Sequence, residues 1–225
     1  MKTVLITGAN KGIGLEMVKQ HVNRGDKVIA VCRTPSKALQ ATDAAVVSNV
    51  DFLSEDFEKT LLNQIEQISS IPHIDKVIAN AGIRDFDNYQ DFDVKAIRNQ
   101  FEVNTIAPLR LIKALDALLT EKTRIILIST RVASHEDNTG GGEYGYRMSK
   151  SALNMAGINL SISLRHRGIA VFMLHPGYVR TDLTLGEGLI DANLSAQNII
   201  ELSDHLTLNE SGSFWHAIER IQLPW

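Results

Sequence analysis

The segment GYRMSK, residues 145–150, carries a tyrosine and a lysine four positions apart, Tyr146 and Lys150. On an α-helix two residues at this spacing share a face, so the phenol and the ammonium would be neighbours. An ammonium about 4 Å from the phenol, at an effective dielectric of ~20, would favour the phenolate by roughly 4 kcal/mol and lower its pKa by about three units. The pair is therefore a candidate proton donor and acceptor, and a solvated pair on a helix surface is the plain alternative.

A glycine-rich turn, TGANKGIG, occupies residues 7–14 between an apolar run and a helix-like run. Gly8, Gly12 and Gly14 permit positive φ and close backbone approach, and a helix amino terminus attracts phosphate. A Walker loop is excluded because no lysine follows a glycine at the required spacing. We predict a pyrophosphate-binding turn, with an ordinary tight turn as the alternative.

The run KVIAVCR ends on Cys32 and Arg33, without the acidic residue that would hold a ribose diol. The planar guanidinium of Arg33 suits a 2′-phosphate, and Lys11 in the glycine turn offers a second cation. We therefore predict NADP(H) in preference to NAD(H). The alternative is that both are solvated surface cations.

Short β-branched runs alternate with helical patterns along the chain. Phe57, Leu61, Ile65 and Ile68 mark one amphipathic helix within residues 54–70, and further helical stretches cover 92–119, the region from Tyr144 onward, and 192–202. The strand-like runs are TVLITG, KVIAVCR, AVVSNVD, KVIANAG, RIILIST, IAVFMLHPG and GSFWHAI. This alternation predicts an α/β Rossmann fold over residues 1–225, a single domain with a doubly wound, mostly parallel seven-stranded sheet and helices on both faces.

Composition narrows the function classes. The 225 residues are 44% hydrophobic with a net charge of −3, which suits one core and a small-molecule partner rather than nucleic acid or a membrane surface. The single cysteine, Cys32, excludes an internal disulfide and is expected to be a buried small hydrophobe rather than a reactive thiol. With neither a secretory signal nor a spanning run, a cytoplasmic protein is expected. The seven histidines lack metal-ligand spacing, so no metal site is predicted.

Asn104 lies inside the helical stretch four residues before Pro108. Proline has no N–H, so the amide that would have bonded to the Asn104 carbonyl is missing and that acceptor is predicted to be free. The alternative is a simple proline kink.

Four motifs in order, TGANKGIG, NAG, YRMSK and PGYVRT, give the whole chain a resemblance to the short-chain dehydrogenase/reductase family. DNTGGGEYGYRMSKSALN, SGSFW and LPW are most similar to its C-factor-like and sniffer-like carbonyl reductases. The resemblance implies that Tyr146 protonates a carbonyl oxygen while Lys150 holds the nicotinamide ribose. It also implies that Asn104 binds a water that relays protons to the lysine.

The resemblance further implies a hydroxyl that orients the substrate carbonyl, where this chain has Ser129 and Thr130. Neighbouring strand residues point to opposite faces, and the register favours Thr130, with Ser129 and Ser134 as rivals. Asp51 would bind the adenine amino group, or would be a plain loop carboxylate. Val179 and Thr181 would hold the carboxamide.

The complete predicted cofactor set is Gly8, Asn10, Lys11, Gly12, Ile13, Gly14, Arg33, Asp51, Asn80, Ala81, Gly82, Tyr146, Lys150, Pro176, Gly177, Val179 and Thr181. The resemblance also implies a homodimer or homotetramer. The expected function is NADPH-dependent reduction of a ketone or aldehyde, or oxidation of the alcohol. The alternative is an NADP(H)-binding signalling or regulatory protein with little turnover. The segment DLTLGEGLIDANLS, residues 182–195, is expected to form a small mobile cover over the substrate site. The sequence therefore does not identify the substrate.

Overall fold

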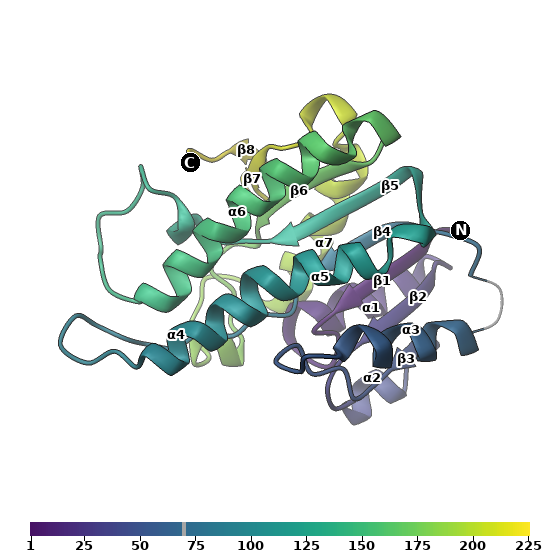
Figure 1. Cartoon of the computed structure of the whole chain (residues 1–225), viewed down its shortest axis with the longest axis horizontal. Coiled ribbons are helices and arrows are strands. Elements are labelled where there is room, and N and C mark those ends of the chain that lie inside the picture. The colour runs from purple at the N-terminus through teal and green to yellow at the C-terminus, as the bar shows by residue number, and fades with distance from the viewer. Residues whose placement is uncertain (69–70) are drawn as a thin grey trace.

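The computed structural model describes residues 1–68 and 71–225 and places every strand in one sheet (Figure 1). The strands are β1 (Thr3–Thr7), β2 (Lys27–Val31), β3 (Ala45–Val47), β4 (Ile74–Ala79), β5 (Leu119–Ile128), β6 (Ala170–His175), β7 (Phe214–His216) and β8 (Ile221–Gln222). Their order is β3-β2-β1-β4-β5-β6-β7-β8. The order reverses between β1 and β4, as in a doubly wound fold whose ligand crevice lies outside the carboxyl ends of the strands.

The sheet has one strand more than the sequence predicted. Strands β1 to β7 pair in parallel and match the seven expected runs, whereas β8 pairs antiparallel to β7. The chain turns back directly after β7, and Trp215 lies opposite Gln222. A two-residue strand is too short to show an alternating pattern, so the sequence carried no signal for it.

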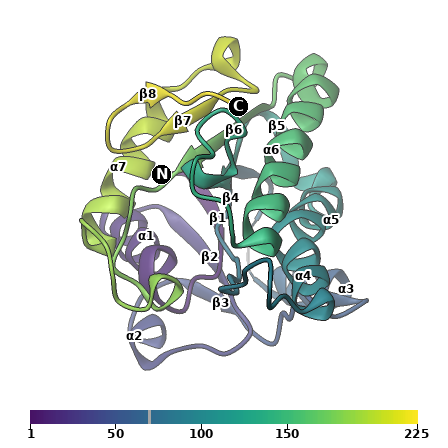
Figure 2. The same ribbon diagram turned by 90° about the vertical axis from the view of Figure 1, so that its left-hand side faces the viewer.

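Helices cover both faces of the sheet, as predicted. They are α1 (Gly12–Asn23), α2 (Lys37–Gln40), α3 (Phe57–Gln67), α4 (Val94–Phe101), α5 (Ala107–Ala114), α6 (Tyr144–Leu164) and α7 (Ala192–His205). Figure 2 shows α1, α2 and α7 on one side of the sheet and α3 to α6 on the other. Among the described residues, no helix is both long enough and apolar enough to cross a membrane.

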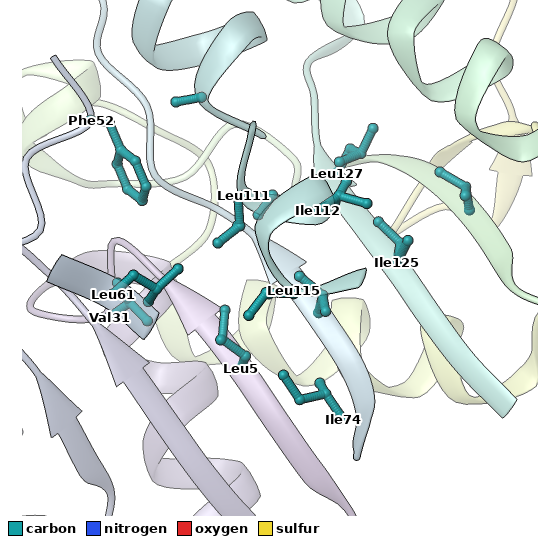
Figure 3. Packing of buried hydrophobic residues seen from close by; sticks show 14 of the residues in the cluster. Leu5, Val31, Phe52, Leu61, Ile74, Leu111, Ile112, Leu115, Ile125 and Leu127 are labelled. Carbon is teal, nitrogen blue, oxygen red and sulfur yellow. The ribbon is translucent and has the colours of Figure 1, made fainter. Parts of the chain in front are cut away.

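The core consists of two apolar layers, one on each face of the sheet. Figure 3 shows one of them, in which Leu5, Ile74 and Ile125 from neighbouring strands pack beneath the helices α3 and α5. The other layer joins Val4, Ile6 and the adjoining strands to α1 and α7. Because the central strands are buried on both faces, their runs are apolar throughout rather than alternating.

The predicted amphipathic helix is α3, which begins at Phe57 rather than at residue 54. Phe57, Leu61 and Ile65 are buried, and Ile68 packs against the same core layer. Residues 69 and 70, at the end of the predicted segment, lie outside the described residues. Cys32 is 2% exposed within the opposite layer, and burial raises the pKa of its thiol, which confirms the small-hydrophobe interpretation.

The predicted helical stretch 92–119 is α4 and α5 joined by a π-helical turn, Glu102–Ile106, and followed by a 3-10 turn, Asp116–Leu118. Pro108 lies in the first turn of α5, where its missing N–H is tolerated. The amide of Ala107 donates instead to the carbonyl of Glu102, five residues back. Pro108 is thus accommodated by a π-helical turn that leads into α5.

A buried cation lies near the amino ends of the central strands, remote from their carboxyl ends. Lys76 on β4 is 1% exposed, and its Nζ donates to Ser203 Oγ and Asp204 Oδ1, each at 2.8 Å. Burial lowers the pKa of Lys76 to about 8, and Asp204 opposes that change. Burial would raise the pKa of Asp204, but the charges and hydrogen bonds of Lys76 and Lys2 outweigh it and hold that pKa well below its usual range. The pair therefore ties α7 to the sheet.

We predict that Asp204→Asn lowers the free energy of unfolding at pH 7 by about 3 kcal/mol, because it leaves a buried ammonium without its counter-charge. Because the pKa of Asp204 is lower in the folded protein than its unfolded value of 3.8, its carboxylate stabilises the fold fully at pH values above 3.8. This stabilisation is lost as the pH falls below 3.8 toward the folded-state pKa. The difference from wild type should therefore shrink below about pH 4. Chemical denaturation across pH measures it.

The matched control is Asp116→Asn, which removes the ion pair between Asp116 and Arg167. The Asp116 side chain is 56% exposed. Exposed pairs contribute at most about 1 kcal/mol. Equal losses for the two variants would contradict the structural role assigned to Asp204.

Candidate active site

Tyr146 and Lys150 both lie on the buried face of α6, near the carboxyl ends of the strands. Their exposures are 7% and 4%. The helix begins at Tyr144, so the phenol lies in the first turn, and α6 packs along β6 and the π-helical turn. The predicted shared face is therefore present, and it is turned into the fold rather than toward solvent.

Lys150 is held at the end of β5. Its Nζ donates to the carbonyl of Ile128 at 2.7 Å, and burial lowers its pKa to about 8. A Cβ added to Gly82 would lie 3.5 Å from Lys150 Nζ and 3.2 Å from Asn104 Oδ1. The sequence-predicted residues Gly82, Asn104 and Lys150 thus meet at one point.

Asn104 is fully buried in the π-helical turn. Its Nδ2 donates to the Ile83 carbonyl at 2.8 Å and to Ser149 Oγ at 3.0 Å, and its Oδ1 accepts the Ile83 amide at 2.8 Å. These bonds fasten the segment after β4 to α6. The predicted free backbone carbonyl of Asn104 stays a prediction, although the missing Pro108 amide is consistent with it.

The predicted lowering of the Tyr146 pKa by Lys150 is wrong for this structure. Burial raises the pKa of the phenol to about 12, while the charge of Arg84 and a hydrogen bond with Thr130 lower it and Glu143 raises it. The Lys150 ammonium instead donates to a main-chain carbonyl. Helical spacing showed that the two side chains share a face but could not show the cost of taking the phenolate out of water.

The three candidate hydroxyls have different partners. Thr130 is buried beside the Tyr146 phenol and lowers its pKa. Ser129 Oγ donates to Asn154 Oδ1 at 2.6 Å, and Ser134 Oγ donates to the Trp225 carbonyl at 3.0 Å. The geometry therefore brings Thr130 to the tyrosine and gives both serines bonds elsewhere in the fold, as strand alternation would require.

The glycine-rich turn runs from the end of β1 into α1. Gly8 has a φ of +65°, and a Cβ there would lie 2.9 Å from the Ala81 Cα. A Cβ on Gly14 would lie 2.2 Å from the Gly8 carbonyl oxygen, so the turn closes only with glycine at that position. Asn10 and Ile13 belong to the same turn, and α1 begins at Gly12 without a carboxylate in its first turn. A helix start of this kind suits an anion.

Thr7 is a contributor that the sequence reasoning missed. Its Oγ1 accepts the amides of Asn80 and Ala81, both at 3.0 Å. The Asn80 side chain in turn donates to the Thr7 carbonyl at 3.0 Å. The predicted Asn80–Gly82 segment thereby braces the glycine turn against β4. A threonine at the end of an apolar strand looks like any other β-branched strand residue, so the sequence did not indicate that its hydroxyl binds the segment after β4.

Arg33 and Asp51 meet beyond the carboxyl ends of β2 and β3. Arg33 Nη1 lies 3.8 Å from Asp51 Oδ2, and their side chains are 72% and 43% exposed. Two of the predicted adenosine-end residues are thus brought together, with the guanidinium open to solvent.

Lys11 forms an ion pair that the sequence did not predict. Its Nζ lies 2.7 Å from Asp182 Oδ2, and both side chains are largely exposed. A Cβ on Gly12 would lie 3.4 Å from Thr181 Cγ2. The glycine turn therefore touches the segment that follows β6, which includes the predicted residue Thr181.

The segment after β6 is a hydrogen-bonded turn. The Pro176 carbonyl accepts Ser195 Oγ at 2.8 Å, Gly177 has a φ of +90°, and Val179 bridges to Ile190. Thr184 Oγ1 lies within bonding distance of the carbonyls of Val179, Thr181 and Glu187. The predicted cover is thus a compact turn that runs into the first residues of α7, which begins at Ala192, and its mobility stays a prediction.

A second group that the sequence reasoning missed flanks Tyr146. Arg84 lies with its Cζ 5.3 Å from the centroid of the Tyr146 ring and pairs with Glu143. The Asp87 carboxylate accepts the amides of Tyr144 and Gly145 and so caps α6. Arg84 and Asp87 belong to the segment after β4, more than 50 positions before α6, and a local pattern does not show which distant carboxylate caps a helix. Within the described part of the chain, no three His, Cys, Asp or Glu side chains gather as a metal site would require.

Residues 2–188 match the family described as short chain dehydrogenase. A 1-hydroxy-2-glutathionyl-2-methyl-3-butene dehydrogenase from Rhodococcus sp. is 38% identical over 96% of this chain and 97% of its own. The C-signal protein of Myxococcus xanthus is 34% identical over 68% of this chain and 93% of its own.

Two solved structures share the fold along the whole chain. The carbonyl reductase Sniffer of D. melanogaster superposes with a TM-score of 0.90 at 28% identity, covering 100% of both chains. An NADPH-bound carbonyl reductase from chicken fatty liver gives 0.89 at 27% identity, covering 100% of this chain and 99% of the other. Together with the matched family and the ordered motifs, these likenesses show that the chain belongs to the short-chain dehydrogenase family.

Proposed function

We propose that this protein is an NADP(H)-dependent oxidoreductase that interconverts a carbonyl compound and its alcohol, with Tyr146 as the proton donor and acceptor. The observation that carries the proposal is that the Tyr146 phenol is buried beside Thr130 and lies on the same helix face as the buried Lys150. A family member that only bound a nucleotide would not require this grouping of titratable side chains.

The residues around the carboxyl ends of β1 and β2 fit NADP(H). The turn closed by Gly8 and Gly14 leaves room for a pyrophosphate against the start of α1, and Arg33 offers a solvent-facing fork for a 2′-phosphate. The NADPH-bound chicken carbonyl reductase supports the same choice. When bound, NADPH supplies the hydride.

The protein's part in the reaction is to hold the carbonyl and to deliver a proton. Because burial raises the pKa of Tyr146 to about 12, the phenol carries its proton at neutral pH and is ready to donate it to a carbonyl oxygen. Thr130 would hold that oxygen in place with a second hydrogen bond. Alcohol oxidation requires the phenolate and should therefore be favoured by alkaline pH.

Lys150 and Asn104 would restore the proton. The lowered Lys150 pKa of about 8 lies near the operating pH, where a side chain passes protons most effectively. The ammonium is buried near Gly82 and Asn104, so a relay would run along the base of α6. The same ammonium would reach a ribose hydroxyl.

The Rhodococcus relative acts, by its name, on an alcohol that carries a glutathionyl group, whereas the solved neighbours are carbonyl reductases. We therefore propose a range of substrates that includes ketones, aldehydes and hydroxylated thioether conjugates. The homodimer or homotetramer expected from the family stays a prediction.

A second candidate is a signalling protein that uses NADP(H) occupancy to set its interactions. The likeness to C-signal favours it. Tight NADPH binding with negligible turnover across a broad substrate panel would support this candidate.

We predict that Tyr146→Phe lowers kcat for NADPH-linked carbonyl reduction by at least about 100-fold, because it removes the proton donor and keeps the ring. NADPH consumption against ketones, aldehydes and quinones measures the loss. Tyr144→Phe, two residues earlier with a 36% exposed side chain, is the matched control and should stay near wild type. Full turnover by Tyr146→Phe would overturn the mechanism.

We predict that Arg33→Ala weakens NADPH binding about 10-fold or more and leaves NADH binding unchanged, since it removes a charge-assisted hydrogen bond to the 2′-phosphate. Asp51→Asn should strengthen NADPH binding, because it removes the negative charge that competes for Arg33 and keeps an oxygen that can accept from the adenine amino group. Fluorescence titration with each nucleotide measures the affinities. Parallel losses for NADPH and NADH would show that Arg33 does not read the 2′-phosphate.

A further inference from the structure

We propose that the Arg84–Glu143 ion pair is a positioning element that sets how readily the Tyr146 phenol gives up its proton. The inference rests on the proposed function, in which that phenol is the acid and base. Arg84 would act through Tyr146 without taking part in the proton transfer itself.

The guanidinium of Arg84 is held between two aromatic rings. Its Cζ lies 4.4 Å from the centroid of Phe86 and 5.3 Å from the centroid of Tyr146. Its Nε and Nη2 both donate to Glu143 Oε1, the former at 2.9 Å. The two charged side chains are only 19% and 17% exposed, so solvent screens their fields weakly.

The main chain fixes both partners. On either side of Arg84, the Ile83 amide donates to Asn104 Oδ1 at 2.8 Å and the Asp85 amide donates to Gln100 Oε1 at 3.1 Å. Glu143 precedes α6 in the left-handed region, with a φ of +48°, and its amide donates to the Asp87 carbonyl at 2.8 Å. Main-chain amides therefore hold the cation and the anion beside the phenol, through the side chains of Asn104 and Gln100 and through the Asp87 carbonyl.

The two charges act on the phenol in opposite directions. After burial, the Arg84 charge is the next largest influence on the pKa of Tyr146 and lowers it, whereas the Glu143 charge raises it. Thr130 adds a hydrogen bond that lowers it. The lowering by Arg84 and Thr130 outweighs the raising by Glu143, so the pair and Thr130 together oppose the cost of burial.

Four other titratable groups on the surrounding elements have partners of their own. They are Lys150 with the Ile128 carbonyl, Asp87 with the amides that begin α6, Arg131 with Asp137 at 2.8 Å, and Tyr178 with Glu187 at 2.8 Å. Within the described residues, Arg84 and Glu143 are the charged side chains whose fields shift the Tyr146 pKa.

The test places 3,5-difluorotyrosine at position 146 of the full chain. The fluorines lower the intrinsic pKa of the phenol, so its titration moves toward milder pH. The ¹⁹F signal reports this one residue among the four tyrosines and needs no turnover. Failure of the proposed reaction and failure of this inference are therefore separate outcomes.

Arg84→Met should raise the measured pKa by about one unit, since an opposite charge at this distance stabilises the ionised form. Arg84→Lys should restore part of the shift, and Glu143→Gln should lower the pKa. The matched control is Arg131→Met, which removes the same charge from a pair with Asp137 and should leave the pKa unchanged.

Equal shifts for Arg84→Met and Arg131→Met would overturn the inference, because the effect would then be one of net charge. Where Arg84→Met fails to fold, Glu143→Gln decides alone. A downward shift supports the inference, and an upward or absent shift overturns it.

Discussion

The hydrogen bond from the Lys150 ammonium to the Ile128 carbonyl ties α6 to the end of β5, and the site depends on that contact. A buried ammonium is tolerated only where a partner replaces water, so the lysine has few positions open to it. Once it is fixed, Tyr146 follows one turn earlier on the same face and comes beside Thr130. Lys150, whose burial costs stability, thus fixes the position of α6 and with it the position of Tyr146.

The segment between β4 and α4 is the second constraint. Its first residues brace the glycine turn through Thr7 and Asn80, its middle is tied to Asn104, and Asp87 at its far end caps α6. One stretch of chain therefore couples the nucleotide end of the site to the helix that carries the tyrosine. Such coupling explains why residues that follow several different strands can be held in one arrangement at the edge of a sheet.

Much of this was readable from sequence because it depends on local pattern. Apolar runs and helical spacing predicted the seven parallel strands and the shared face of Tyr146 and Lys150, and strand alternation favoured Thr130 over Ser129. The strand β8 was missed because two residues show no period. The tyrosine's pKa was misjudged because helical spacing does not measure desolvation, which here outweighs the charges nearby. Arg84, Glu143 and Asp87 were missed because their partners are distant in sequence.

We propose that hydride passes to a carbonyl carbon in this site while Tyr146 supplies the proton. The most direct measurement is mass spectrometry of the alcohol formed from a carbonyl substrate and NADPH deuterated on the transferred face of C4. The account predicts one deuterium in the product, formed at a rate that collapses in Tyr146→Phe. NADPH binding without deuterium in any product, across ketones, aldehydes and thioether conjugates, would contradict it and favour the signalling role.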